Sequence, residues 1–87
     1  MRDIQVIRVD DVNFQVTVND KATTIHHVTV QDAYASKLTN GKVSKEDLVK
    51  KSFEFLLERE SNTSILRHFD LSVISRYFPE YERTIFK

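Results

Sequence analysis

Apolar and polar residues alternate without interruption between positions 12 and 18, which is the pattern of a β-strand with one buried face. The apolar positions in this segment are Val12, Phe14, Val16 and Val18. An apolar run at 4–9 precedes it, and a run rich in Thr and Val follows at 22–30. These three segments predict an antiparallel three-stranded β-meander that spans about residues 3–30.

The first turn of the meander decides which side chains of the first strand are buried. A two-residue turn at 10–11 places Ile7 opposite Phe14 on the buried face. Ile4 and Val6 then have the opposite phase, which requires either a bulge or a first strand that is apolar on both sides.

The loop at 19–21 leaves two registers open for the third strand. A two-residue loop puts His27 on the buried face, whereas a three-residue loop puts His26 there. We favour the three-residue loop, with His26 as a core histidine that is hydrogen-bonded to a nearby carbonyl or tyrosine hydroxyl.

After residue 30 the apolar period lengthens to about 3.6 residues, which predicts helices. A first helix ends at Asn40-Gly41, where the only glycine of the chain supplies a left-handed stop. The main helix begins after Ser44, which caps it with Asp47 at the third helical position. Its apolar arc over 48–57 covers about 200°, too wide for a single sheet contact. We therefore expect a second contact, either with later helices or with another subunit.

The last part of the chain predicts short helical segments. Asp70 caps a helix that ends or kinks at Pro79, because proline removes a backbone donor and disfavours helical geometry before it. Whether 79–87 forms a further helix stays open. The expected fold class is α+β, with the meander followed by three to four helices packed on one face of the sheet. A chain of this length predicts a single domain, 1–87.

Charge and composition argue against several classes of function. Basic and acidic residues number 13 each, so the chain lacks the cationic surplus that phosphate-backbone binding requires. The absence of cysteine excludes disulfides and thiolate chemistry. No apolar run approaches the ~20 residues that span a bilayer, and the polar start lacks a signal-peptide core. We therefore expect a cytoplasmic protein with no membrane partner.

No group of residues has the spacing of a catalytic or metal site. His26 and His27 point to opposite faces of a strand, so they cannot hold one ion together, and a site around either needs further ligands. A single glycine cannot build a phosphate loop, and the serines lie at caps or within helices. The sequence thus predicts no catalytic residue, no cofactor and no bound metal.

The densest aromatic patch of the chain begins at residue 76. Tyr and Arg are favoured at the centres of protein interfaces, which makes this patch a candidate interaction surface. It consists of Arg76, Tyr77, Phe78, Tyr81 and Phe86. The alternative interpretation is that Phe78 and Tyr81 close the core.

Three hypotheses about function follow from these patterns. The first is a noncatalytic protein-interaction module, which binds itself as a homodimer or binds another protein. The second is a nucleic-acid-associated protein that uses a strip of lysines, Lys42, Lys45, Lys50 and Lys51. The third is an enzyme or metal protein built around His26 or His27.

Two segments carry a resemblance to a known family. Residues 52–60 (SFEFLLERE) and 69–81 (FDLSVISRYFPEY) resemble a family of small uncharacterised bacterial proteins of nearly this length. The resemblance covers most of the chain. It implies a bacterial, cytoplasmic origin and brings no activity, cofactor or site residue.

Overall fold

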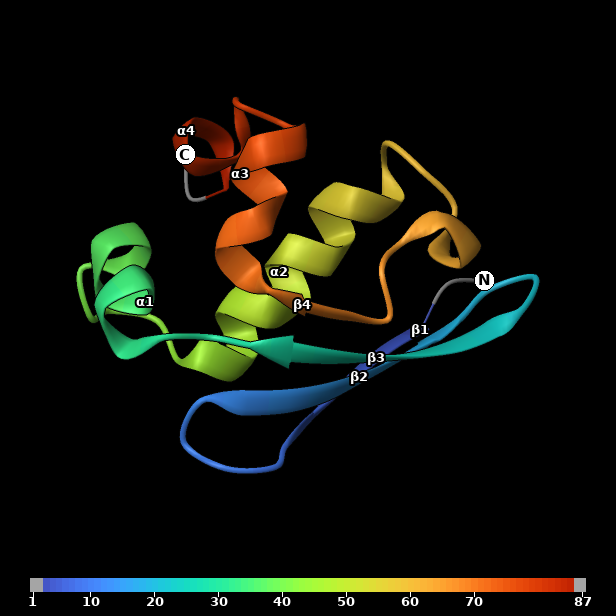
Figure 1. Ribbon diagram of the computed structural model, residues 1–87, viewed down its shortest axis with the longest axis horizontal. Coiled ribbons are helices and arrows are strands. Elements are labelled where there is room, and N and C mark those ends of the chain that lie inside the picture. Colours follow the sequence, from blue (N-terminus) through green and yellow to red (C-terminus); the bar gives the residue numbers. More distant parts are fainter. Residues whose placement is uncertain (1–2, 86–87) are drawn as a thin grey trace.

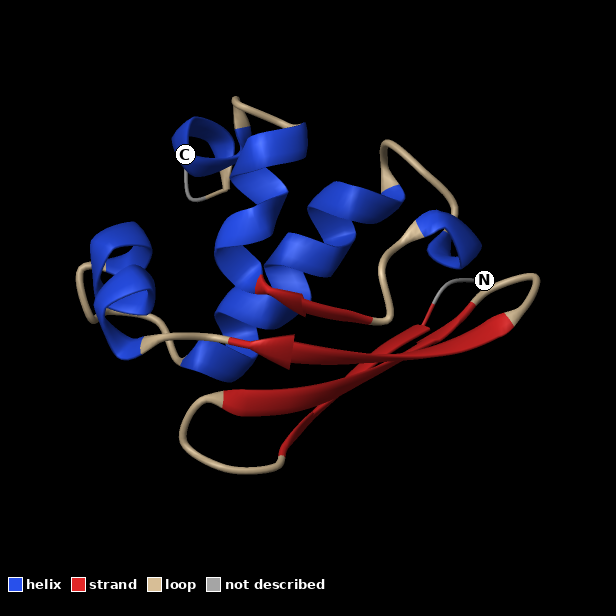
Figure 2. Ribbon diagram, in the orientation of Figure 1, coloured by secondary structure: helices blue, strands red, loops and turns tan. Residues whose placement is uncertain are grey.

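The computed structural model describes residues 3–85. Within them, four strands form one sheet in the order β1-β2-β3-β4. Their bounds are β1 (Asp3–Arg8), β2 (Asn13–Asn19), β3 (Thr23–Thr29) and β4 (His68–Asp70). The first three strands are antiparallel neighbours, and β4 runs parallel to β3. The helices lie on one face of this sheet (Figures 1 and 2).

The helical layer consists of four α-helices and two 3₁₀ turns in the described residues. Their bounds are α1 (Asp32–Thr39), α2 (Lys45–Leu57), η1 (Asn62–Ser64), η2 (Leu71–Val73), α3 (Ile74–Tyr77) and α4 (Tyr81–Thr84). The α+β class, the meander and the helices after it are confirmed. The sheet has one strand more than expected, because β4 adds a parallel edge that the sequence pattern did not indicate.

The first hairpin differs from the expected register. Arg8 faces Phe14 and Val6 faces Val16, so the connection covers 9–12 instead of 10–11. Val6 packs against the core, as does Ile4, whereas the side chain of Ile7 is 53% exposed. The expectation that Ile7 lies on the buried face was therefore wrong, and the first strand has apolar residues on both faces.

Asp10 explains why this turn is longer than two residues. Its carboxylate accepts hydrogen bonds from the backbone N–H groups of Val12 and Asn13, and from the side-chain amide of Asn13. Such local bonds from Asp stabilise a turn of their own. The backbone N–H of Val9 then donates to the carbonyl of Asn13 and closes the loop.

The second hairpin has the register that we favoured. Asn19 pairs with Thr23, which leaves a three-residue loop at 20–22. His26 is 0% exposed, and His27 is on the outer face. The apolar residues that are buried on the same face of the meander as His26 are Phe14, Val16, Val18 and Val28.

The predicted helix boundaries around residues 40 and 44 are confirmed. Asn40 and Gly41 both have left-handed backbone angles, with φ of 54° and 72°. The hydroxyl of Ser44 accepts the backbone N–H of Asp47 at 3.1 Å and caps α2. The left-handed residues and the Ser44 cap together determine the turn between the two helices.

Both sides of the wide apolar arc on α2 are covered within the chain. Phe53 faces the sheet, where its ring lies 5.2 Å from the ring of His26. On the other side, the ring of Phe55 lies 5.2 Å from Tyr81 and 5.8 Å from Phe78. Later helices therefore provide the second contact, and the width of the arc no longer requires another subunit.

The last helices follow the predicted breaks. The carboxylate of Asp70 accepts the N–H of Ser72, which starts η2 and then α3. Phe78 leaves helical geometry, with φ −130° and ψ 88°, directly before Pro79. Helix α4 follows, so part of 79–87 is helical. None of the helices in residues 3–85 has the length and hydrophobicity needed to cross a bilayer.

Candidate functional site: an apolar groove with one carboxylate

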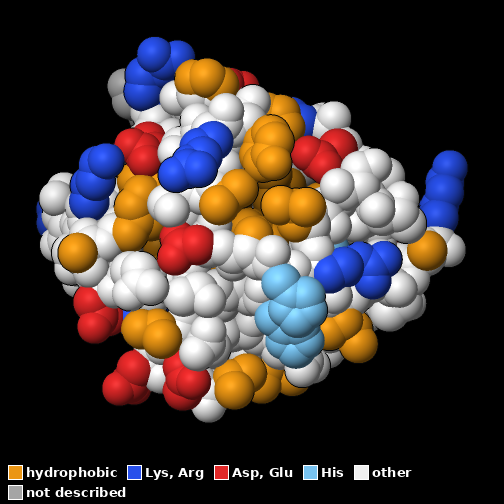
Figure 3. Space-filling model, in the orientation of Figure 1, with side chains coloured by type: hydrophobic (Ala, Val, Ile, Leu, Met, Phe, Trp, Pro, Cys, Tyr) orange, Lys and Arg blue, Asp and Glu red, His pale blue; other side chains and the backbone are white. Residues whose placement is uncertain are grey.

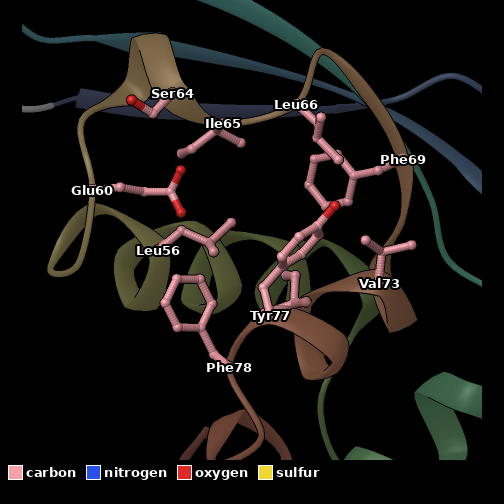
Figure 4. A pocket seen from close by; sticks show the side chains of 10 residues that line it. Leu56, Glu60, Ser64, Ile65, Leu66, Phe69, Val73, Tyr77 and Phe78 are labelled. Carbon is pink, nitrogen blue, oxygen red and sulfur yellow. The ribbon is translucent and has the colours of Figure 1, made fainter.

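A groove of about 210 Å³ opens where the end of α2, β4 and α3 meet (Figure 4). Its apolar walls include Leu56, Ile65, Leu66, Phe69, Tyr77 and Phe78. The floor is part of the core, since Leu56 and Ile65 are buried, whereas Leu66 is 48% and Tyr77 67% exposed at the rim. Figure 3 shows hydrophobic side chains gathered on the surface over these elements. The groove is thus an opening of the core to solvent.

Three segments build the walls of the groove. In the extended segment after η1, Ile65 turns inward and Leu66 outward, as alternate residues of an extended chain do. In β4, Phe69 turns inward to within 6.1 Å of the Phe53 ring, measured between ring centroids. Helix α3 ends at Tyr77, and both Tyr77 and the next residue, Phe78, line the groove.

Among the described residues that line the groove, Glu60 is the one carboxylate. Its side chain points across the groove toward Leu56 and Ile65 (Figure 4). Burial raises the pKa of this carboxyl above its usual range. Across residues 3–85, no basic group pairs with it and no side chain donates a hydrogen bond to it. A cation placed here would compensate a charge that has no basic partner among residues 3–85.

The structure divides the interaction surface expected from the sequence. Arg76 and Tyr77 are exposed, and Phe78 is partly buried at the groove. Tyr81 is 0% exposed and closes the core, which was the alternative interpretation for this residue. Phe86 lies outside the described residues. Tyr77 and Phe78 are thus the members that reach the groove.

The other groove residues were not found by sequence reasoning, although one signal pointed to them. Ile65 and Leu66 are adjacent in an extended segment, so they cannot both face the core. One of the two had to be an exposed aliphatic side chain. Phe69 and Glu60 gave no comparable signal, because their position depends on contacts between distant segments.

One lysine of the strip, Lys45, forms an ion pair within the protein. The ammonium of Lys45 contacts the carboxylate of Asp32 and the carbonyl of Asp11, and its side chain is only 14% exposed. Lys42, Lys50 and Lys51 are exposed. Lys45 therefore supports the packing of α2 against its neighbours and offers little charge to a nucleic acid.

His26 has a structural role in a chain of buried hydrogen bonds. Its Nδ1 lies 2.7 Å from the carbonyl oxygen of Leu66, so this nitrogen carries the proton and donates. Nε2 then accepts from the hydroxyl of Thr24 at 2.8 Å. Both ring nitrogens are therefore occupied, and His26 does not reach the groove.

Stability should fall as the protein is acidified from about pH 7 to about pH 5. Burial lowers the pKa of His26 in the fold, so the unfolded chain, with a pKa near ~6.5, takes up the proton first. The stabilisation is complete above that value and is lost below it, by at most about 1.4 kcal/mol per pH unit. Urea unfolding at a series of pH values measures this slope.

A substitution assigns the slope to His26. His26→Gln should flatten the dependence between about pH 7 and about pH 5. Carboxylates with a lowered pKa, such as Glu46 beside Arg8, act below this window. An unchanged slope in the variant would show that another group is responsible.

Comparisons with protein-family models, with curated proteins and with solved structures found no match to this chain. The resemblance to a bacterial family therefore stays a prediction.

Proposed function

We propose that this protein is a noncatalytic protein-interaction module, and that its groove binds a partner segment carrying a large apolar side chain next to a Lys or Arg. One observation carries the proposal: an apolar groove is open at Leu66 and Tyr77 and has a carboxylate, Glu60, without a basic partner in residues 3–85. An apolar side chain with a neighbouring cation complements both features.

The size of the groove favours a side chain over a small metabolite. Small-molecule pockets usually enclose ~300–1,000 Å³ and present several convergent polar groups. This groove has about 210 Å³ and an almost wholly apolar wall. It resembles the pockets in which a single anchor residue of a protein partner is buried.

The charge of Glu60 supplies specificity. A carboxylate beside apolar walls attracts a cation more strongly than one in bulk water, because the local dielectric is lower. A basic group that reaches Glu60 makes a charge-assisted hydrogen bond and restores the solvation lost by burial. Partners with an acidic residue at this position are disfavoured by the same physics.

A second copy of this chain is the other occupant that a particular observation supports. Arg76 and Tyr77 are both exposed on α3 and form a basic and aromatic pair of the kind that the groove complements. In a two-fold dimer, Arg76 of each copy would face Glu60 of the other. The homodimer therefore remains within the proposal, as one identity of the partner.

The proposal predicts which peptides bind and which substitutions weaken their binding. Random peptides selected by display on the untagged protein should be enriched in an aromatic or leucine residue beside Lys or Arg. Tyr77→Ala should weaken binding of a selected peptide about tenfold or more, as expected for an interface anchor. Glu60→Gln should weaken binding of that peptide, and have little effect once its basic residue is replaced by Gln. Isothermal titration calorimetry measures each affinity.

Two controls match these variants. Ile7→Ala removes an exposed apolar side chain from β1, and Glu54→Gln removes an exposed carboxylate from α2, both away from the groove. Neither should change the affinity. Light scattering across a concentration series tests self-association, which Glu60→Gln and Arg76→Gln should each reduce. Two results together would contradict the proposal: the protein is a monomer, and every selected peptide binds the Tyr77→Ala variant with the same affinity as the wild type.

A further inference from the structure

Two exposed histidines stand side by side on adjacent strands. His27 of β3 and His68 of β4 are register partners in the parallel pair. Their rings are stacked, with centroids 4.8 Å apart and planes at 18°. Figure 3 shows histidine side chains together on the surface, with basic side chains beside them. The pairing of β4 with β3 thus places His68 beside His27, although the two residues are far apart in the sequence.

The ring nitrogens of this pair are free for a ligand. In the described part of the chain, neither ring makes a hydrogen bond with the protein, in contrast to His26, whose two nitrogens are both bonded. The backbone beneath them is fixed, because the N–H of His27 donates to the carbonyl of Arg67 at 2.6 Å. The two side chains therefore start from defined positions and keep freedom to rotate.

We propose that His27 and His68 together bind one divalent transition-metal ion, with Cu²⁺ bound more tightly than Ni²⁺ or Zn²⁺. Imidazole nitrogens lie ~2.0–2.1 Å from such ions. Two ligands on one ion are then about 3 Å apart, which two rings on neighbouring strands reach by rotating out of the stack. Neutral imidazole suits these metals, and Cu²⁺ leads the affinity order for a given site.

The surroundings define the kind of site. Among residues 3–85, no third His, Cys, Asp or Glu completes a cluster that could hold a metal ion. Water fills the other coordination positions, so this is an open surface site and not a closed structural zinc site. Arg67, next to His68 in the chain, adds a positive charge that opposes the ion. Arg67→Gln should therefore tighten binding.

The bound ion would join β4 to β3. The pairing of β4 with β3 covers only three residue pairs, from His68 to Asp70. A metal that binds the folded chain and bridges the two strands stabilises the fold by mass action. The expected sign is a rise in melting temperature when Cu²⁺ is added.

Calorimetric titration of the untagged full chain with CuCl₂ tests the proposal. We expect one ion per chain, and His27→Gln or His68→Gln should each weaken binding at least tenfold and remove the rise in melting temperature. Gln15→Ala is the control, because Gln15 is the register partner of His27 on β2 and has no imidazole. Both histidines are exposed, so circular dichroism should show that the variants fold.

The competing outcomes are distinct. If the two imidazoles bind independently, each variant keeps half of the bound copper with unchanged affinity, and the shared site is overturned. Absence of binding in the wild-type chain overturns it as well. The electron paramagnetic resonance spectrum of bound Cu²⁺ should show two nitrogen ligands in the wild type and one in each variant. None of these results depends on whether the groove binds a partner.

Discussion

Tyr81→Ala should lower the free energy of unfolding by about 3–5 kcal/mol, the usual loss when a large aromatic side chain is removed from a core. The side chain of Tyr81 is 0% exposed, and its ring packs 5.2 Å from that of Phe55 on α2. The loss is a large share of the ~5–15 kcal/mol that stabilises a typical domain. Urea unfolding followed by circular dichroism measures it.

Two further variants separate the reasons for this effect. Tyr77→Ala removes the same side chain from an exposed position and should change stability by about 0.5 kcal/mol or less. Tyr81→Phe removes only the hydroxyl that lies 2.5 Å from Ser52 Oγ, and should cost about 1 kcal/mol. Ser52 still donates to the carbonyl of Leu48 in that variant. Equal losses for Tyr81→Ala and Tyr77→Ala would contradict the assignment of Tyr81 to the core.

The contrast between these two tyrosines also shows how far the sequence could predict the candidate site. Both lie in one aromatic run, and composition alone favours them equally as interface residues. Their roles differ because Pro79 ends α3 and turns the chain, so that Tyr81 packs onto α2 and Tyr77 is left at the rim of the groove. That outcome depends on the angle at which short helices meet, which periodicity does not encode.

Local rules account for the parts of the fold that were predicted. Alternation over 12–18, the cap at Ser44 and the left-handed stop at Asn40-Gly41 each involve residues a few positions apart. Such signals can be read without knowing the rest of the structure. Two expectations were wrong, the length of the first turn and the number of strands, and the physical reason differs between them.

The first failure was a competition between two local devices. The pattern at 10–11 favours a short hairpin turn, but the carboxylate of Asp10 bonds the following backbone and lengthens the loop. The second failure was long-range. Strand β4 has only three residues, and it is a strand because β3 lies beside it, not because of its own sequence. The groove and the histidine pair both depend on β4, so neither could be predicted.

A second large effect is expected at Asn62, which joins η1 to the sheet. Its side-chain amide is buried and donates to the carbonyl of Ala22 at 2.9 Å and to the hydroxyl of Thr24 at 3.0 Å. Asn62→Leu keeps the volume but leaves both acceptors without this donor, which should cost about 2–3 kcal/mol. The hydroxyl of Thr24 also donates to His26, and His26 donates to the carbonyl of Leu66. The substitution should therefore weaken this chain of hydrogen bonds as well. Urea unfolding measures the total cost.

Hydrogen exchange identifies which part of the fold loses stability in Asn62→Leu. The amides of Ser64 and Ile65, which donate to the carbonyls of Ser61 and Asn62, should exchange faster in Asn62→Leu than in the wild type. Thr63→Ala is the matched control, because Thr63 is exposed in the same turn and its hydroxyl lies 2.9 Å from the hydroxyl of Ser61, which is also exposed. If both variants have the same stability, the buried amide does not anchor this wall of the groove. If Asn62→Leu is destabilised while these amides stay protected, the loss arises in the meander instead.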